Sequence, residues 1–143
     1  MSTLILGHEH HMKPENIRCS PIDPNLWYNK PFTAVSFMCG KEDTDIVYDL
    51  YGRKKDDKHW DWKFAEDNSY DTIVDCMGSI SWEGLNRGKK YRFQDELLET
   101  ILRVLKINGK FYSHFGIYTK INETNLEFEP KERAFGSYRY KDF

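Results

Sequence analysis

The chain has 143 residues, and 21 Lys and Arg side chains against 23 Asp and Glu side chains give it a formal net charge of −2. This balance excludes the strongly basic composition of nonspecific nucleic-acid binders, so any contact with RNA or DNA would need a local patch. The length fits a single domain spanning residues 1–143, and an aromatic content of 15% supplies enough ring surface for burial to exclude a disordered chain.

The first half of the chain carries short strand signals separated by turns. Residues 3–6 are an apolar run closed by Gly7, which is typical of a buried strand entering a turn. Residues 16–19 predict a weak strand before two prolines, and residues 32–38 fit a strand or a short helical turn. Residues 45–50 are rich in β-branched and aromatic side chains and predict a further strand.

The second half predicts strands around one helix. Residues 70–78 contain the clearest buried strand, and apolar residues recur at helical spacing from Gln94 to Ile107, where Asn108-Gly109 ends the helix. Residues 110–115 predict another strand, and alternation in the remaining residues predicts a closing hairpin. Strands separated by loops or a helix indicate an α/β fold with a largely parallel sheet and an antiparallel edge.

Three aspartates are candidate ligand-binding groups of this sheet. Asp23, Asp49 and Asp75 follow successive predicted strands, and the carboxyl ends of parallel strands line one crevice in an open α/β sheet. A carboxylate there could accept hydrogen bonds from ribose hydroxyls or from an adenine amino group. The alternative is that each Asp only turns or caps the chain after its strand.

Five segments, taken in order, carry a resemblance to a known family. They are Leu4-Ile5-Leu6-Gly7, Ile22-Asp23, residues 45–50, residues 64–74 and residues 97–111. Together they resemble the first strand and glycine, the second-strand acid, the third strand with the acid that faces adenine, the fourth strand, and the helix and fifth strand of compact class I S-adenosylmethionine-dependent methyltransferases. The resemblance covers residues 3–115 and implies a Rossmann-like, mostly parallel sheet flanked by helices.

The resemblance also implies an activity and a set of site residues. A substrate oxygen, nitrogen or carbon would attack the sulfonium methyl of bound S-adenosylmethionine in one displacement, with positioning as the main catalytic effect. Asp75 and Glu83 are candidate bases for a substrate that holds a proton on the attacking atom. No pattern in the chain names that substrate. The residues implied to line the cofactor site are Gly7, His8, Glu9, Asp23, Asp49, Leu50, Cys76 and Met77.

The chain departs from the resembled family in the first loop and after the fourth strand. Where relatives place a second glycine, so that the methionine portion of the cofactor lies against bare backbone, this chain has Glu9. Glu9 would either block the cofactor or pair with its amino group. Ser79-Ile80-Ser81-Trp82 replaces a Glu-His pair. Intact Asp23 and Asp49 favour an active S-adenosylmethionine-dependent methyltransferase, which we predict. The lost glycine favours the alternative, a catalytically inactive binding or structural module with a protein partner in a larger assembly.

Two further patterns have an ordinary explanation beside a functional one. His8, His10 and His11 with Glu9 could hold zinc, but the stronger His-x-His-x-Asp-His spacing is not present, and we prefer a solvated loop with no metal. Residues 87–93 are a basic, aromatic stretch that could grip the phosphate of a nucleic acid, or could be a solvated approach to the helix.

The compartment is predicted from the cysteines and from the hydropathy pattern. No apolar run approaches the roughly 20 residues of a membrane helix, and the first residues lack the basic start and long apolar core of a signal peptide. Cys19, Cys39 and Cys76 form no Cys-x-x-Cys pair, which favours reduced thiols. We therefore expect an intracellular protein, in the cytoplasm, without membrane contact.

Overall fold

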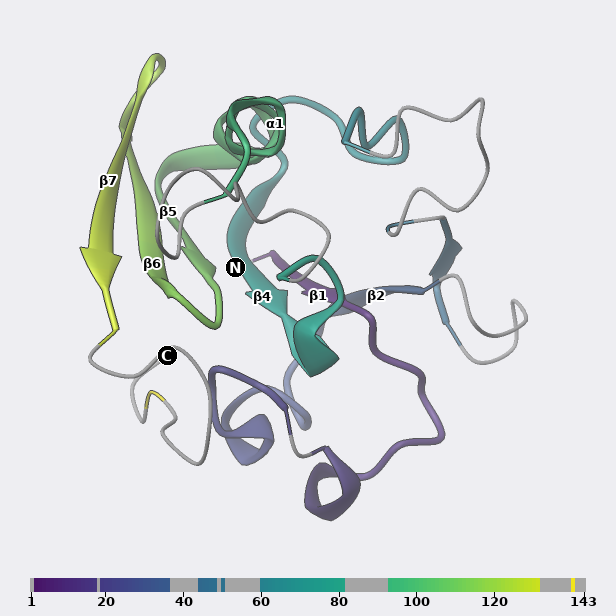
Figure 1. Ribbon diagram of the computed structural model, residues 1–143. Helices are drawn as coiled ribbons and strands as arrows, with labels where there is room; N and C mark the ends of the chain where they lie inside the picture. Colours follow the sequence, from purple (N-terminus) through teal and green to yellow (C-terminus); the bar gives the residue numbers. More distant parts are fainter. Residues whose placement is uncertain are drawn as a thin grey trace.

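A mixed β-sheet forms the centre of the structure, a computed structural model that describes residues 2–17, 19–36, 44–48, 50, 60–81, 93–131 and 140 (Figure 1). Within these residues it has seven strands in the order β3-β2-β1-β4-β5-β6-β7. They are β1 (Thr3–Leu6), β2 (Thr33–Ser36), β3 (Ile46–Val47), β4 (Tyr70–Asp75), β5 (Leu105–Tyr112), β6 (Gly116–Asn122) and β7 (Asn125–Pro130). Strands β1 to β5 pair in parallel, and β6 and β7 add an antiparallel hairpin. The largely parallel sheet with an antiparallel edge agrees with the sequence.

The central strands β1 and β4 are continuous apolar runs because both faces of the sheet are covered at this position. All four residues of β1 are buried, with Leu4 and Leu6 on one face and Ile5 on the other. Ile73 and Val74 of β4 continue the alternation, since β1 and β4 pair in register. Each face of the sheet therefore carries its own hydrophobic cluster.

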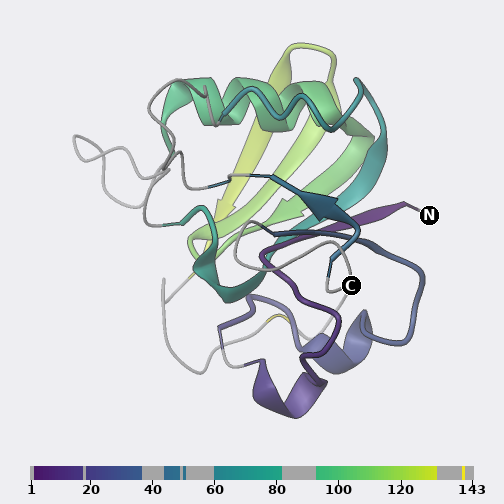
Figure 2. The ribbon, with the colours of Figure 1, turned by 90° about the vertical axis from the view of Figure 1, so that its right-hand side faces the viewer.

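One face is covered by α1 (Asp95–Val104), which is the one α-helix among the described residues (Figure 2). Its Leu97, Ile101 and Val104 side chains are buried, at the helical spacing that the sequence predicts. Acidic residues occupy the first turn of the helix and Arg103 its last, in the order that the helix dipole favours.

Arg103 also joins α1 to the segment that precedes β4. Its guanidinium donates hydrogen bonds of 2.8 to 3.1 Å to the Ala65, Asp61 and Trp62 carbonyls and to the Asp67 carboxylate. The Arg103 side chain thus bonds three carbonyls and one carboxylate of the turn at residues 61–67, which packs over the sheet beside the helix.

The helix is shorter than the sequence predicts. The chain passes directly from Val104 into β5 at Leu105, although the apolar spacing continues to Ile107. Pairing with β4 overrides the helical periodicity here, because Leu105 aligns with Tyr70 in the sheet. The expected helix stop at Asn108-Gly109 instead lies inside β5, where the β4–β5 register is irregular and Asn108 has a φ of 70°.

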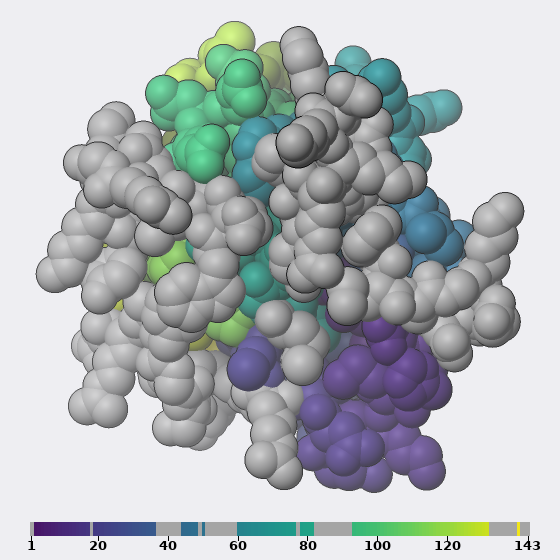
Figure 3. Space-filling view, turned by 45° about the vertical axis from the view of Figure 1, so that its right-hand side comes forward, coloured from purple at the N-terminus to yellow at the C-terminus, as the bar shows by residue number. Residues whose placement is uncertain are grey.

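The other face is covered by the segment between β1 and β2. It contains two short 3-10 turns, η1 (Pro14–Asn16) and η2 (Pro24–Leu26), and no α-helix is present among its described residues. Prolines begin both turns, a position where the missing N–H and the fixed φ of proline are tolerated. The weak strand expected at 16–19 is wrong, because η1 and a bend lie there. In the space-filling view, purple atoms of this segment gather opposite the green atoms of α1 (Figure 3).

The two edges of the sheet differ from the expected strands. Residues 45–50 form only the two-residue strand β3, and β2 lies between β3 and β1. At the other edge, β7 carries exposed Glu127 and Glu129 and ends at Pro130. The closing hairpin is β6–β7, and Tyr140 of the expected tail strand forms an isolated parallel bridge with Ile22.

No helix in the described part of the chain combines the length and the apolar character needed to cross a bilayer.

Candidate functional site

The order of the strands reverses between β1 and β4. The chain proceeds from β1 outward through β2 and β3 on one side, and from β4 through β5 on the other. In open parallel sheets, the carboxyl ends of the strands at such a reversal form the usual ligand crevice. Gly7 follows β1 here, and the 3-10 turn η3 (Cys76–Gly78) follows β4.

Gly7 is covered by the turn that follows β4. Its φ is +77°, in the left-handed region, and its N–H donates to the Val35 carbonyl at 2.7 Å. A β-carbon placed on Gly7 would lie 1.6 Å from Ser79 Oγ and 2.8 Å from the Cys76 carbonyl oxygen. The protein's own chain therefore occupies the space over the bare backbone of Gly7.

Asp75 lies at the carboxyl end of β4, as the sequence predicts, and its side chain holds this turn closed. The carboxylate is fully buried and accepts hydrogen bonds from the Ile80 N–H at 3.1 Å and from the Ser81 hydroxyl. Burial raises the pKa of Asp75 to about 7, although the hydrogen bonds from the turn act in the opposite direction.

Asp23 does not lie at the carboxyl end of a strand of the sheet, so this expectation is wrong. It precedes β2 and is the N-cap of η2, where its side chain accepts from the Asn25 N–H at 3.0 Å and from the Asn25 amide at 3.1 Å. Asp and a following proline are favoured residues at the start of a helical turn. Asp23 therefore has the capping role that the sequence left as the alternative.

The remaining predicted cofactor residues are dispersed. Leu50 belongs to the cluster on the α1 face, whereas Cys76 is buried in the cluster on the opposite face. The Glu9 carboxylate pairs with His11 at 3.3 Å. Asp49, Glu83 and the side chain of Met77 lie outside the described part of the chain. The structure thus brings Gly7, Asp75 and Cys76 together at the crevice, without Asp23 or Leu50 at a strand end beside them.

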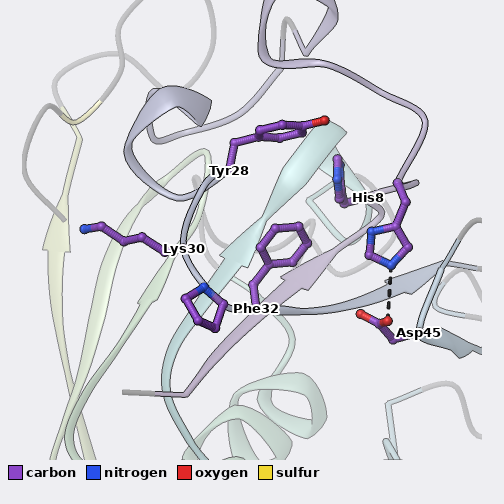
Figure 4. A pocket seen from close by; sticks show the side chains of 7 residues that line it. His8, Tyr28, Lys30, Phe32 and Asp45 are labelled. Atoms are coloured by element: carbon purple, nitrogen blue, oxygen red, sulfur yellow. Dashed lines mark hydrogen bonds and ion pairs between the residues drawn. The ribbon is translucent and has the colours of Figure 1, made fainter.

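A separate pocket of about 390 Å³ lies next to the first loop (Figure 4). Its lining includes His8, His10, Tyr28, Lys30, Phe32 and Asp45. His8 and His10 come from the loop after β1, the next three residues precede β2, and Asp45 precedes β3. The pocket is therefore formed by segments that adjoin three strands of the parallel sheet.

His8 is the buried polar side chain of this pocket. Its ring is fully buried, with centroids 5.0 Å from Trp27, 5.4 Å from Phe32 and 6.2 Å from Tyr28, all edge to face. Within the described part of the chain, neither ring nitrogen has a hydrogen-bond partner. Burial, followed by the nearby His10 and His11, lowers the pKa of His8 to about 4. The imidazole is therefore neutral at pH 7 and offers one donor and one acceptor.

His10 is held at the rim of the pocket by Asp45. The His10 Nε2 lies 3.2 Å from Asp45 Oδ1, and Asp45 Oδ2 accepts from the Ala34 N–H at 2.7 Å. This pair fixes the first loop against the start of β2. Among the described residues, no three His, Cys, Asp or Glu side chains are grouped so that they could hold a metal ion.

Sequence reasoning missed this pocket, although it singled out His8 and its neighbours. Trp27 and Tyr28 lie where the sequence predicts no element, and Phe32 begins the segment 32–38 that fits a strand or a short helical turn. The available signal was a group of aromatic residues close to prolines, together with a histidine shortly after the first strand. Nothing in the spacing alone indicates that the chain folds back to place those rings on His8.

No protein-family model, no curated protein and no solved structure matches this chain.

Proposed function

We propose that this chain is a Rossmann-like, methyltransferase-like domain that does not transfer methyl groups and serves as a binding or structural module, as part of a larger assembly. The observation that carries the proposal is the packing of Ser79 and the Cys76 carbonyl against Gly7. In the resembled family, the methionine portion of S-adenosylmethionine lies against bare backbone in this loop. In this chain Glu9 stands at the position of that bare backbone, and the space over Gly7, two residues earlier in the same loop, is occupied by the chain's own turn.

The strand arrangement supports the methyltransferase-like part of the proposal. The parallel strands follow the order β3-β2-β1-β4-β5, as in the first five strands of a dinucleotide-binding sheet. Gly7 follows the first strand in a left-handed conformation. The similarity lies in the sheet and this glycine, whereas the covering of the face opposite α1 by 3-10 turns departs from it.

The hydrogen bonds of the turn at residues 76–81 support the loss of cofactor binding. The Ser79 hydroxyl donates to the Cys76 carbonyl at 2.6 Å, and Asp75 accepts from two further groups of the turn. These groups are buried, so displacing the turn would break several hydrogen bonds inside the protein. A cofactor would have to supply that free energy from its own contacts.

An active S-adenosylmethionine-dependent methyltransferase is the second candidate, and the pKa of Asp75 favours it. A carboxyl with a pKa of about 7 is suited to accept a proton near neutral pH. In this alternative, the cofactor displaces the turn at residues 76–81, and the cofactor and substrate then exclude water from Asp75 in place of the turn, which keeps the pKa of this base raised.

Titration calorimetry with S-adenosylhomocysteine and 5′-methylthioadenosine separates the two candidates, because the second compound lacks the amino-acid portion. The proposal predicts that the parent shows no preference for S-adenosylhomocysteine. Ser79→Gly removes the hydroxymethyl group over Gly7 and should then gain about tenfold or more in affinity for S-adenosylhomocysteine alone. Ser69→Gly is the matched control, because the Ser69 hydroxyl also donates to the carbonyl three residues earlier, but at the amino end of β4 and not over Gly7. This variant should behave like the parent.

The opposite result would contradict the proposal. A parent that binds S-adenosylhomocysteine about tenfold or more tightly than 5′-methylthioadenosine has a functional methionine pocket. If Ser79→Gly then leaves that binding unchanged, the space over Gly7 does not limit the cofactor and the proposal is wrong.

A further inference from the structure

The pocket beside the first loop has the dimensions and lining of a small-molecule site. Its volume of about 390 Å³ falls at the lower end of the range of roughly 300 to 1,000 Å³ that such sites span. Figure 4 shows His8 beside the rings of Tyr28 and Phe32. His10, which also lines the pocket, forms a hydrogen bond with Asp45. Flat aromatic walls around a small volume favour a flat ligand of one ring or two fused rings.

His8 supplies the hydrogen-bonding pattern that the ligand has to match. Buried side-chain nitrogens almost always have a partner, and an exception requires an explanation. His8 is fully buried and lines the pocket, and among the residues that the structure describes neither Nδ1 nor Nε2 has a hydrogen-bond partner. Because the imidazole is neutral, the ring nitrogen that faces the ligand is either a donor or an acceptor, and the complementary group on the ligand ring is uncharged.

The charges at the rim agree with an uncharged ligand ring. Lys30 and Asp45 bring one positive and one negative side chain to the pocket, so neither sign of ion is favoured. The Asp45 carboxylate already accepts from His10 and from the Ala34 N–H, which leaves its attraction for a cation reduced. A wholly apolar ligand would leave His8 unpaired. A nitrogen heteroaromatic ring satisfies both the aromatic walls and the imidazole.

We propose that this pocket binds a nucleobase-type ring, an uncharged planar nitrogen heterocycle that stacks on Tyr28 or Phe32 and forms hydrogen bonds with His8. The site is distinct from the crevice at Gly7 and does not depend on whether that crevice admits a cofactor. Two sources carry this chemistry, a free nucleoside and a base at the end of a single-stranded RNA, and the experiment separates them.

The first test is titration of the isotope-labelled full chain with adenosine, guanosine, cytidine and uridine, followed by NMR at the histidine ring nitrogens. At least one nucleoside should bind with a Kd of about 1 mM or below and shift both His8 nitrogens. His8→Phe keeps an aromatic ring but removes the hydrogen bonds, and it should weaken binding about tenfold or more. Its melting temperature should equal or exceed that of the parent, because an unpaired buried polar group is removed.

Two control variants keep the test decisive. His11→Phe makes the same exchange at an exposed neighbour that pairs with Glu9 outside the lining, and it should keep the parent affinity. Tyr28→Leu should weaken binding by roughly five- to a hundredfold through lost stacking, and it replaces His8→Phe if that variant does not fold. A tetranucleotide that binds about tenfold more tightly than the nucleoside, with the same dependence on His8, assigns the source to RNA, and equal affinity assigns it to the free nucleoside.

Three results would overturn the proposal. One is that none of the four nucleosides shifts the His8 nitrogens. Another is unchanged affinity in both His8→Phe and Tyr28→Leu. The third is that zinc, and no nucleoside, shifts His8 and His10 together, which would make the loop a metal site.

Discussion

Replacing Gly7 by alanine tests the contact on which the proposed function rests. A glycine in an ordinary conformation gives a more stable protein by about 0.4 to 1 kcal/mol when changed to alanine, because the unfolded chain loses freedom. Gly7 has a φ of +77°, and this region costs other residues about 1 to 2 kcal/mol. The new methyl group would also lie 1.6 Å from Ser79 Oγ and 2.9 Å from Ser79 Cβ, an overlap that typically costs about 1 to 3 kcal/mol.

The expected effect is therefore a loss of about 2 to 5 kcal/mol in the free energy of unfolding, the sum of the backbone and packing terms. For a chain of this size each kcal/mol corresponds to about 3 °C, so the melting temperature should fall by roughly 6 to 15 °C. Urea denaturation followed by circular dichroism measures the free energy, and a thermal scan measures the melting temperature.

A double-mutant cycle with Ser79→Gly separates strain at Gly7 from overlap with Ser79. Ser79→Gly removes both Ser79 atoms that the new methyl would meet, so the double variant should recover about 1 to 2 kcal/mol relative to the sum of the single variants. Additivity within about 0.5 kcal/mol would show that Ser79 does not lie on Gly7. A stabilising Gly7→Ala would refute the left-handed conformation as well, and with it the closed crevice.

Three further predictions concern the buried polar groups and the helix. Folded Asp75 has a raised pKa, so its contribution to stability is lost as the pH rises from 4 to 7, whereas His8 and His114, with pKa values lowered to about 4, lose theirs as the pH falls from 6.5. Between pH 4 and 6.5 the unfolded chain thus binds two protons at these groups, and the folded chain binds one. Asp75→Asn removes the proton of the folded chain, so the free energy of unfolding in urea titrations should change more steeply with pH, by about 1.4 kcal/mol per pH unit. An unchanged slope would contradict the raised pKa of Asp75. In Arg103→Lys the new side chain cannot bond the same four acceptors, so the protein should lose about 1 to 3 kcal/mol of stability. Proteolysis between residues 60 and 67 measures the local effect, and a chain that stays uncut there would contradict it. Ile101→Asp should bury an unpaired charge in the α1 face and destabilise by several kcal/mol, and an unaltered melting temperature would contradict the burial of this side chain.

Local patterns in the sequence predicted the strands and the helix segment in which the pattern of burial stays the same from end to end. Residues 3–6 and 72–75 read as strands because both faces of the sheet are covered, and residues 97–104 have one apolar face. The end of the helix was misplaced because Leu105 satisfies the helical spacing and the strand equally, and only its pairing with Tyr70 decides between them. Tertiary contacts of this kind leave no periodic signal.

The candidate site was predicted less well, for a related reason. Asp23 has the residue type and the sequence position of a strand-end acid, but Pro24 makes it the cap of a turn instead. Gly7 was predicted correctly as the end of the first strand, yet Ser79, which covers it, is 72 residues away along the chain. The aromatic rings around His8 likewise come from another part of the sequence, so their convergence is a property of the folded chain.

The edges of the sheet determine how this domain can associate with other chains. An outer strand normally offers a row of free N–H and C=O groups to any extended peptide, which is a common route to aggregation. At one edge β3 has only two residues to offer, and at the other β7 presents the negative charges of Glu127 and Glu129 and ends at Pro130. Two copies meeting at β7 would repel each other. Any partner should therefore be recognised through side chains on the faces and loops. The protein should also form no fibrils at concentrations where a sheet with an uncharged edge strand would pair with further chains.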